Sequence, residues 1–355
     1  MTASIDLKHL YSAARLAIRG HGGAEPNPMV GCVITNANGV VVGSGYHRLY
    51  GDSHAEVNAI RDASESANGG TAYITLEPCN HHGKTPPCSQ KIIESGIKRV
   101  VIGVADPHPD AGGGAAFLKQ SGIDVEIVND EFCIDLIAPF IHRLKTNLPW
   151  VICKWAQTID GCSEPTLNGS QWISSPTSLR MVHRERGRVD AIVVGAETVI
   201  TDNPKLTVRG ATKRRTPIRV IIDPTLRTPS NCNIFNEEAI TLIAHAEGLD
   251  ASSHSPYAIG LPSKGKALDL YPLLRHLVSE FNATNVICEG GATTFGHLFD
   301  QRLANELWIF TAPHLASHTP KINMNNLIKK LSLRLMDKRS RGVDSVLRYR
   351  IHNCQ

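Results

Sequence analysis

The sequence predicts two α/β domains that follow one another along the chain. First, its 355 residues suffice for about two domains, at roughly 100–200 residues per domain. Second, short apolar runs of strand length alternate with segments of helical periodicity, which is typical of a largely parallel sheet covered by helices. Third, a long helical segment ends at Thr146-Asn147-Leu148-Pro149, and a new apolar run follows. We therefore expect one domain over residues 1–147 and another over residues 148–355.

The composition excludes several classes of protein. With 42% hydrophobic and 20% charged residues, the chain has the composition of a folded soluble protein rather than a disordered one. A net charge of +4 is too weak to predict nucleic-acid binding, and we interpret the basic run Lys213-Arg214-Arg215 as a solvated loop rather than a nucleic-acid patch. No apolar run approaches the roughly 18 residues of a membrane-spanning helix. Residues 1–20 lack the apolar core of a signal peptide, so we expect a cytoplasmic protein without a membrane partner. Nine scattered cysteines are then core residues or metal ligands rather than a disulfide framework.

The first domain is expected to open with a helix and a hairpin. Residues 1–20 have the periodicity of an amphipathic helix, and Asn36-Ala37-Asn38-Gly39 between two apolar runs predicts a hairpin of residues 30–35 and 40–45. Helices and strands alternate after the hairpin. We expect helices from His54 through residue 60 and at 88–95, 115–120 and 131–145, with a kink at Pro139 in the last, and strands at 72–76, 99–104 and 125–128.

The second domain repeats this alternation. We expect strands at 150–156, 191–194, 218–222, 240–244, 286–288 and 307–311, and helices at 177–186 and 271–281. Residues 246–268 are rich in serine, glycine and proline and are expected to form a loop.

The sharpest functional signal is His54-Ala55-Glu56, followed by Pro78-Cys79 and Pro87-Cys88. One histidine and two cysteines are zinc ligands of the usual type, and three protein ligands leave a fourth position for water, as in catalytic sites. Zinc lowers the pKa of that water to roughly 7. Glu56 is the natural proton shuttle, because zinc nucleobase deaminases use a glutamate that is not a ligand as general acid and base. The pattern predicts one catalytic zinc ion held by His54, Cys79 and Cys88.

Two simpler interpretations remain beside this one. The three side chains could be a buried histidine and two core cysteines. They could also form a structural zinc site, which would need a fourth ligand such as His81 or His82.

A family resemblance is carried by the segment that contains both cysteines, Thr75-Leu76-Glu77-Pro78-Cys79-Asn80-His81-His82-Gly83-Lys84-Thr85-Pro86-Pro87-Cys88. Most zinc nucleobase deaminases separate the two cysteines by two residues, whereas eight intervene here. With Pro26-Asn27-Pro28 and Gly45-Tyr46-His47, it resembles the deaminase domain of the bifunctional riboflavin-biosynthesis deaminase/reductase family. The resemblance implies a cytidine-deaminase-like α/β/α zinc domain and a diaminohydroxypyrimidine substrate that carries a phosphoribosylamino group and loses its amine at C2. By position it implies substrate contacts from Asn27, His47, His81 and Lys84, each of which could instead be an ordinary turn or loop residue.

The second half contains no G-x-G-x-x-G motif but resembles the reductase domain of the same family. The resemblance rests on Asp160-Gly161, Ser170-Gln171-Trp172-Ile173, residues 202–209 and Cys288-Glu289-Gly290-Gly291. It implies a dihydrofolate-reductase-like α/β fold that uses NADPH to convert the ribosyl group to ribityl. By position, the implied NADPH contacts are Ala156, Trp172, Thr198, Asp202, Gly291, Ala292, Thr293, Thr294, Phe295, Gly296 and His297. The implied substrate contacts are Ser170, Arg186, Leu206, Arg209 and Glu289. Trp172 could instead be a buried core residue, and the two arginines could lie on the surface without a ligand.

Several residues depart from the family pattern near the expected cofactor side, among them Gln157, Asn203 and Pro224. A second hypothesis is therefore an active deaminase whose C-terminal domain is inactive or takes another substrate. A third is a zinc-stabilised nucleotide-binding protein without turnover, against which Glu56 argues because a binder needs no proton shuttle. The resemblance favours small pyrimidine ribosyl phosphates as partners and leaves homo-oligomerisation open.

Overall fold

The chain folds into two compact units, Met1–Thr146 and Asn147–Gln355, each with its own hydrophobic core. The structure is a computed structural model that describes residues 2–81, 86–108, 112–163, 172–265, 267–316 and 324–352. Lys84 and Ser170 lie outside these ranges. No helix in the described ranges is both long and apolar enough to cross a membrane.

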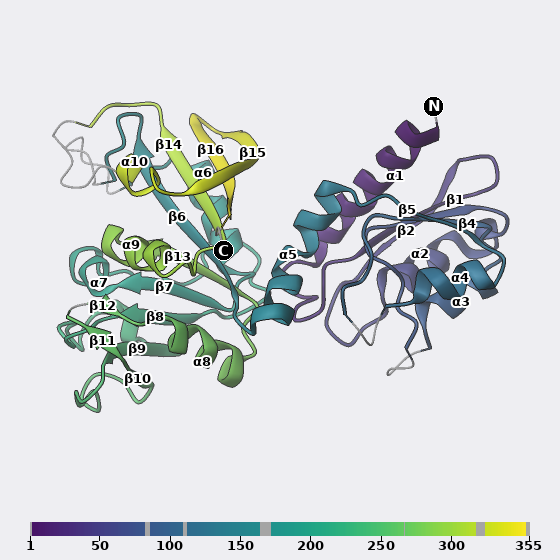
Figure 1. Cartoon of the computed structure of the whole chain (residues 1–355). Helices are drawn as coiled ribbons and strands as arrows, with labels where there is room; N and C mark the ends of the chain where they lie inside the picture. The colour runs from purple at the N-terminus through teal and green to yellow at the C-terminus, as the bar shows by residue number, and fades with distance from the viewer. Residues whose placement is uncertain are drawn as a thin grey trace. The chain divides into compact units, whose positions relative to one another are not determined.

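The first unit is built on a five-stranded sheet with the order β2-β1-β3-β4-β5 (Figure 1). The strands are β1 (Gly31–Thr35), β2 (Val41–Tyr46), β3 (Thr71–Ile74), β4 (Arg99–Ile102) and β5 (Asp124–Ile127). β1 runs antiparallel to both β2 and β3, and β3, β4 and β5 are parallel. This is the expected opening hairpin followed by parallel strands, with the turn closed by the Asn36 side chain, which accepts hydrogen bonds from the N–H groups of Asn38 and Val40.

Helices cover both faces of this sheet. They are α1 (Thr2–Ala17), α2 (Ala55–Ala63), α3 (Cys88–Glu94), α4 (Gly114–Gln120) and α5 (Glu131–Thr146), with 3-10 turns η1 (Ile18–Gly20) and η2 (Ser64–Ala67). Ala59 of α2, Ile92 of α3 and Leu118 of α4 share one core cluster with Ile34 and Ile74. Neighbouring strand residues point to the other face, where Leu10 of α1 packs with Tyr73 and Val101. The unit is thus an α/β/α sandwich.

A close backbone approach fixes α2 against the sheet. A Cβ atom on Gly45 of β2 would lie 2.4 Å from the carbonyl oxygen of Ala55. Only glycine permits this contact. The start of α2, which follows His54, is therefore held directly over the end of the hairpin.

The second unit is built on a nine-stranded sheet with the order β10-β9-β8-β7-β13-β6-β14-β16-β15. All neighbouring strands from β10 to β14 are parallel, and β16 and β15 continue the sheet in antiparallel pairing. The strands are β6 (Trp150–Thr158), β7 (Ala191–Gly195), β8 (Ile218–Ile222), β9 (Thr241–Ala246), β10 (Ala258–Leu261), β13 (Asn285–Gly290), β14 (Glu306–Ala312), β15 (Ser332–Arg341) and β16 (Asp344–His352). A separate two-stranded ribbon joins β11 (Ser263–Lys264) to β12 (Ala267–Leu268).

The helices of the second unit are α6 (Pro176–Arg186), α7 (Ala196–Asp202), α8 (Tyr271–Phe281), α9 (Ala292–Asp300) and α10 (Met324–Leu327), with a 3-10 turn η3 (Asn233–Phe235). The buried strand β7 carries an unbroken apolar run, as expected for a parallel strand covered on both faces, and β8 departs from this pattern only at the buried Arg219. Phe295 of α9 packs on Trp155 of β6, with ring centroids 5.4 Å apart.

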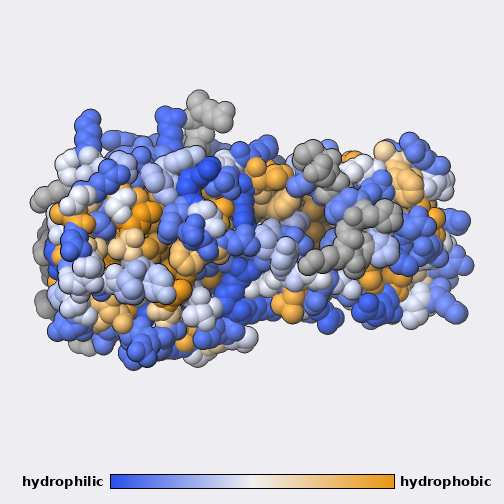
Figure 2. All heavy atoms as spheres, turned by 90° about the horizontal axis from the view of Figure 1, so that it is seen from below, coloured by the Kyte–Doolittle hydropathy of each residue, from blue (hydrophilic) through white to orange (hydrophobic). Residues whose placement is uncertain are grey.

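On the face shown in Figure 2, hydrophilic residues predominate and hydrophobic ones form smaller patches.

Most expected elements are confirmed within one to three residues. The expectation of a loop over residues 246–268 is wrong, because β10, β11 and β12 form there. This stretch lacks the apolar pattern of a strand, because three of the four residues of β10 are not buried. Helix α7 and the hairpin β15–β16 were not among the expected elements. The described cysteines are all free thiols, and Cys32, Cys133, Cys153, Cys162 and Cys288 are buried, as expected for core residues.

Candidate active sites

His54, Cys79 and Cys88 form a cluster in the first unit. His54 caps the start of α2, Cys79 lies in the segment after β3, and Cys88 is the first residue of α3. The Nδ1 atom of His54 lies 3.6 Å from the Cys79 sulfur and 3.3 Å from the Cys88 sulfur. One ligand atom from each residue lies within 4.8 Å of the others. One imidazole nitrogen and two thiolates at this spacing fit a tetrahedral zinc ion with a fourth position left open.

The electrostatics of the cluster favour a thiolate. The pKa of Cys79 is lowered to about 4, mainly because Cys88 hydrogen-bonds to its sulfur, against the opposing effect of burial. The backbone N–H of Cys88, at the start of α3, also points at the Cys79 sulfur from 3.4 Å. The same side-chain hydrogen bond, followed by burial, raises the pKa of Cys88. Since the two thiols share one proton in this way, a cation bound between them would favour both thiolates.

Glu56 lies in the first turn of α2, two residues after His54, and is almost completely buried, with 3% of its surface exposed. Its Oε2 atom has no hydrogen-bond partner among the described residues. Burial raises the pKa of Glu56 to about 6, although the nearby His54 opposes the shift. A carboxylate with a spare buried oxygen and a raised pKa has the properties of a group that takes up and releases a proton near neutral pH.

His47 and Asn27 lie beside the cluster. The His47 ring stands edge-on to the His54 ring, with centroids 5.2 Å apart. Asn27 Nδ2 lies 3.3 Å from His47 Nε2, and His47 Nδ1 lies 3.3 Å from the Ser53 carbonyl oxygen. Burial, and next the charge of His54, lower the pKa of His47. The neutral ring can then donate from Nδ1 to Ser53 and accept from Asn27. His81 is exposed, and no described contact joins it to this group.

Glu77 was not singled out by the sequence. Its carboxylate is buried and accepts hydrogen bonds from the backbone N–H groups of Asp106, Gly113 and Ala115, at 2.9–3.1 Å. It thereby ties two backbone segments on either side of residues 109–111 to the segment that carries Cys79. The sequence feature that could have identified Glu77 is its position as an acidic residue in a largely apolar run before Pro78-Cys79.

A second group of charges lies in the other unit, where Arg186 of α6 meets Glu289 of β13. Arg186 donates from Nε to Glu289 Oε1 at 2.6 Å and from Nη2 to Oε2 at 2.9 Å. Lys154 of β6 points at the same carboxylate from 4.0 Å. Cys153 of β6 pairs with Cys288 of the adjacent parallel strand β13. The next residues on the two strands, Lys154 and Glu289, therefore also lie side by side. Sequence reasoning missed Lys154, although a lysine within an apolar strand is an unusual residue.

Opposing effects determine the protonation of this group. Burial alone would raise the pKa of Glu289, but Arg186 and then Lys154 lower it to about 2. Burial lowers the pKa of Lys154, Glu289 opposes this, and Arg186 adds to it. Glu289 is therefore held ionised, and Lys154 is a lysine that gives up its proton more readily than usual.

The expected cofactor residues gather where β13 meets α9. A Cβ atom on Gly290 or Gly291 would lie 3.2 or 3.3 Å from the Thr198 hydroxyl oxygen. The glycines therefore keep a narrow space open between α7 and the start of α9, whose first N–H groups have no partner within the helix. Phe295 packs in the core, so its backbone alone can face a ligand. The N-terminus of α9 and its glycines have the chemistry of a phosphate site.

The other expected residues of this unit differ in their exposure. Trp172 is 51% exposed and is not a core residue. Burial raises the pKa of Asp202. Leu206 is buried, and Arg209 is exposed, with its backbone N–H donating to His183 Nδ1 at 3.2 Å.

The departures from the family pattern have local structural roles. Gln157 accepts a hydrogen bond from Trp155 Nε1 at 2.8 Å and donates to Asn325 at 3.3 Å. Asn203 ends α7 with a φ of 42°, a left-handed conformation that asparagine tolerates. Asp223, before Pro224, is buried, and its Oδ2 accepts from the N–H and hydroxyl of Thr228.

Two family descriptions match the chain. Residues 4–104 match the cytidine and deoxycytidylate deaminase zinc-binding region, and residues 149–347 match the RibD C-terminal domain. The riboflavin biosynthesis protein RibD of Aquifex aeolicus is 35% identical, with 98% of this chain and 99% of that protein covered. The Escherichia coli protein of the same name is 37% identical, with 87% and 88% covered.

Solved structures agree with these matches. A diaminohydroxyphosphoribosylaminopyrimidine deaminase/5-amino-6-(5-phosphoribosylamino)uracil reductase from Thermotoga maritima has a TM-score of 0.81 at 30% identity, covering 99% of this chain and 100% of that chain. Acinetobacter baumannii RibD has a TM-score of 0.78 at 30% identity, covering 99% of both. The expected fold classes are confirmed. The chain belongs to the RibD family and is a bifunctional enzyme of riboflavin biosynthesis, with a zinc-binding deaminase domain and a reductase domain.

Proposed function

We propose that the first domain, residues 1–147, hydrolyses the C2 amine of 2,5-diamino-6-(5-phosphoribosylamino)pyrimidin-4(3H)-one. The second domain, residues 148–355, then reduces the ribosyl group of 5-amino-6-(5-phosphoribosylamino)uracil to ribityl with NADPH. The observation that carries the proposal is the pairing of a three-ligand cluster with a buried carboxylate whose Oε2 has no partner among the described residues. The name of the Thermotoga maritima relative supports the two substrates.

In the deaminase, His54, Cys79 and Cys88 hold the zinc ion, which supplies Lewis-acid activation of water when bound. Glu56 takes a first proton from the attacking water at its free Oε2 and gives it to the ring nitrogen. A second proton, from the hydroxyl then bound to C2, passes through the same oxygen to the departing amine, which leaves as ammonia. Its raised pKa suits both transfers, because the group must gain and lose a proton in each turnover. Asn27 and His47 orient the pyrimidine edge, and His81 and Lys84 contact the substrate from the segment between the cysteines.

In the reductase, NADPH supplies a hydride when bound, and its contacts are the residues named above from Ala156 to His297. Glu289 and Arg186 hold each other rigid beside the sugar, with Ser170, Leu206 and Arg209 completing the substrate set. The ribosyl ring opens when its ring oxygen accepts a proton. We assign that proton to Lys154 Nζ, because this group is buried and has a lowered pKa.

A coupled assay tests the two activities. Purified, zinc-loaded protein would be given the diaminopyrimidine ribosyl phosphate, with ammonia release and NADPH oxidation followed separately. Matching rates of both support the bifunctional proposal. Ammonia without NADPH or NADH oxidation would favour a deaminase with an inactive or altered second domain. No activity in either channel, with zinc bound, would contradict the substrate assignment and favour a nucleotide-binding protein.

A further inference from the structure

Arg219 is a buried cation that has no role in the proposed mechanism. It lies in β8, none of its surface is exposed, and its strand is otherwise apolar. Within the described ranges, no acidic side chain forms an ion pair with its guanidinium group. A buried charge without such a partner is costly unless other polar groups surround it. The groups that Arg219 contacts therefore indicate why a charge is present in this strand.

The guanidinium group holds backbone carbonyl groups of two separate loops. Its Nη1 atom donates to the Asn236 side chain at 2.8 Å and to the Lys205 carbonyl oxygen at 3.3 Å. Its Nη2 atom donates to the carbonyl oxygens of Asn236, at 2.6 Å, and of Ala239. Arg219 therefore ties the segment after α7, residues 203–209, to the loop that precedes β9.

The segment after α7 is strained next to the carbonyl group that Arg219 holds. Leu206 is buried and has a φ of 51°, in the left-handed region that leucine rarely adopts. Such a conformation costs free energy and persists only where surrounding contacts maintain it. The Lys205 carbonyl before it is bound to Arg219, and the Thr207 carbonyl after it accepts a hydrogen bond from Arg186 Nη1 at 3.4 Å. Two arginines thus hold the peptide groups on either side of the strained residue.

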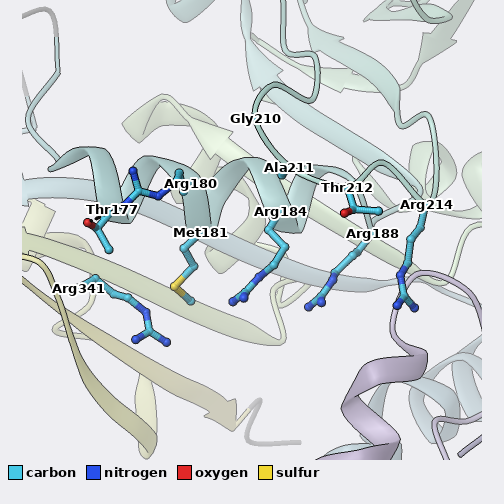
Figure 3. Close-up of a pocket in the computed structure, with 10 residues that line it drawn as sticks. All are labelled: Thr177, Arg180, Met181, Arg184, Arg188, Gly210, Ala211, Thr212, Arg214 and Arg341. Atoms are coloured by element: carbon cyan, nitrogen blue, oxygen red, sulfur yellow. Dashed lines mark hydrogen bonds between the residues drawn. The ribbon is translucent and has the colours of Figure 1, made fainter.

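Further contacts fix both ends of this segment. At its start, the Asn203 side chain accepts a hydrogen bond from the Asn233 N–H at 2.7 Å, and the Asn203 carbonyl accepts one from Asn233 Nδ2 at 3.1 Å. At its end, the Arg209 N–H donates to His183 of α6. Beyond it the chain passes alongside α6 through Gly210 (Figure 3). The backbone of the segment is therefore held at several points.

The segment after α7 carries two of the proposed substrate contacts of the reductase, Leu206 and Arg209, and Arg186 is a third. Backbone strain of this kind is found where a fixed geometry meets a ligand. We propose that Arg219 is a positioning residue for substrate binding in the second domain. By holding the Lys205 carbonyl, it keeps the segment in the conformation that binds the ribosyl phosphate substrate. This role rests on the proposed function of that domain.

Arg219→Lys tests the proposal, because lysine keeps the charge but its single nitrogen cannot replace the four hydrogen bonds of the guanidinium group. The titration is done with NADP+ present, since NADP+ cannot donate a hydride. Binding of 5-amino-6-(5-phosphoribosylamino)uracil should be about tenfold weaker, as for the loss of one charge-assisted hydrogen bond. KM for this compound should rise by a similar factor. The kcat of NADPH oxidation should change by less than about threefold, because Arg219 touches no reacting group.

Hydrogen exchange distinguishes positioning from general damage. In Arg219→Lys, the amide groups of residues 203–209 should exchange faster, whereas those of β7 and the affinity for NADP+ alone should stay unchanged. Arg275→Lys, at an exposed position of α8, makes the same substitution elsewhere and should change neither quantity. Ammonia release should be unaffected in both variants.

Asn203→Gly is a second variant, which acts on the same segment from an exposed position and keeps the test decisive if Arg219→Lys does not fold. Glycine adopts the φ of 42° freely but lacks the side chain that accepts the Asn233 N–H. We expect KM for the reductase substrate to rise about threefold or more in this variant.

The proposal would be overturned by faster exchange of residues 203–209 without any loss of substrate affinity, or by unchanged substrate affinity in both variants. An equal loss of NADP+ affinity would also overturn it, because the damage would then not be specific to the substrate. If the unsubstituted protein neither binds nor reduces the compound, the proposed function fails, and the role of Arg219 in substrate binding fails with it.

Discussion

Arg186 and Glu289 form a two-pronged ion pair across the second unit, with nitrogen–oxygen distances of 2.6 and 2.9 Å. Both side chains are largely buried, with 11% and 6% of their surfaces exposed. A buried pair of this kind is costly to break, because the remaining charge stays in a poorly solvated place. The pair therefore fixes the end of α6 to the end of β13.

The pair makes stability depend on pH in a defined range. The pKa of Glu289 falls from 4.5 to about 2 on folding, so its ionised form stabilises the fold above pH 4.5, and this stabilisation is lost as the pH falls from 4.5 through about 2. Glu289→Gln should lower the free energy of unfolding at pH 7 by about 3 kcal/mol. The difference from the unsubstituted protein should shrink toward pH 2. Chemical unfolding across this pH range measures it, with the exposed Glu280→Gln as the control. A deficit that is independent of pH would contradict the assignment.

Lys154 should be required for reduction alone. Lys154→Met retains the length of the side chain in its buried site but removes the proton, so NADPH oxidation should fall by about a hundredfold or more. Ammonia release should be unchanged, because that chemistry lies in the other domain. Lys264→Met, at an exposed position, should leave both rates intact. An equal fall in both rates would indicate general unfolding and would refute a specific role.

Glu77 should stabilise the deaminase domain through the backbone that it holds. Glu77→Gln keeps the shape, but an amide has one oxygen where the carboxylate uses two to accept three N–H groups. We expect a loss of about 1–3 kcal/mol in unfolding free energy. Thermal and chemical unfolding would measure the stability of Glu77→Gln and of the control variant Glu65→Gln, whose substituted residue is exposed. Identical stability of both variants would show that these hydrogen bonds contribute nothing.

Removal of zinc should separate the two activities. A chelator should abolish ammonia release, and added zinc should restore it. NADPH oxidation with the already deaminated substrate should continue, since His54, Cys79 and Cys88 are in the first unit. Loss of both activities on chelation would place the metal in a structural role for the whole chain.

Much of the cluster around His54 could be predicted from sequence because its chemistry depends on residue types at fixed positions. Cys79 and Cys88 are recognisable beside His54 and Glu56 without knowledge of the fold. The role of Glu77 could not be predicted in this way. Its partners are backbone N–H groups of Asp106, Gly113 and Ala115, and any residue type at those positions, proline excepted, offers the same donor.

Strand order explains what was missed in the second unit. Lys154 and Glu289 meet only because β6 and β13 are neighbours in the sheet. No pattern in the sequence predicts that these two strands pair. The hairpin β15–β16 escaped prediction for another reason. Exposed, charged residues such as Lys338 and Arg339 in β15 obscure the apolar alternation that marks a strand.

In the proposed mechanism, Glu56 moves the proton in a zinc site that Glu56 does not help to build. Glu56→Gln keeps the size of the side chain and leaves all three ligands in place, so the variant should still bind one zinc ion per chain. Its ammonia release should fall by about two to four orders of magnitude, while NADPH oxidation with the deaminated substrate stays at the original rate. Measuring zinc content and both rates on this one variant is the most direct test. Full zinc content with undiminished ammonia release would contradict the account.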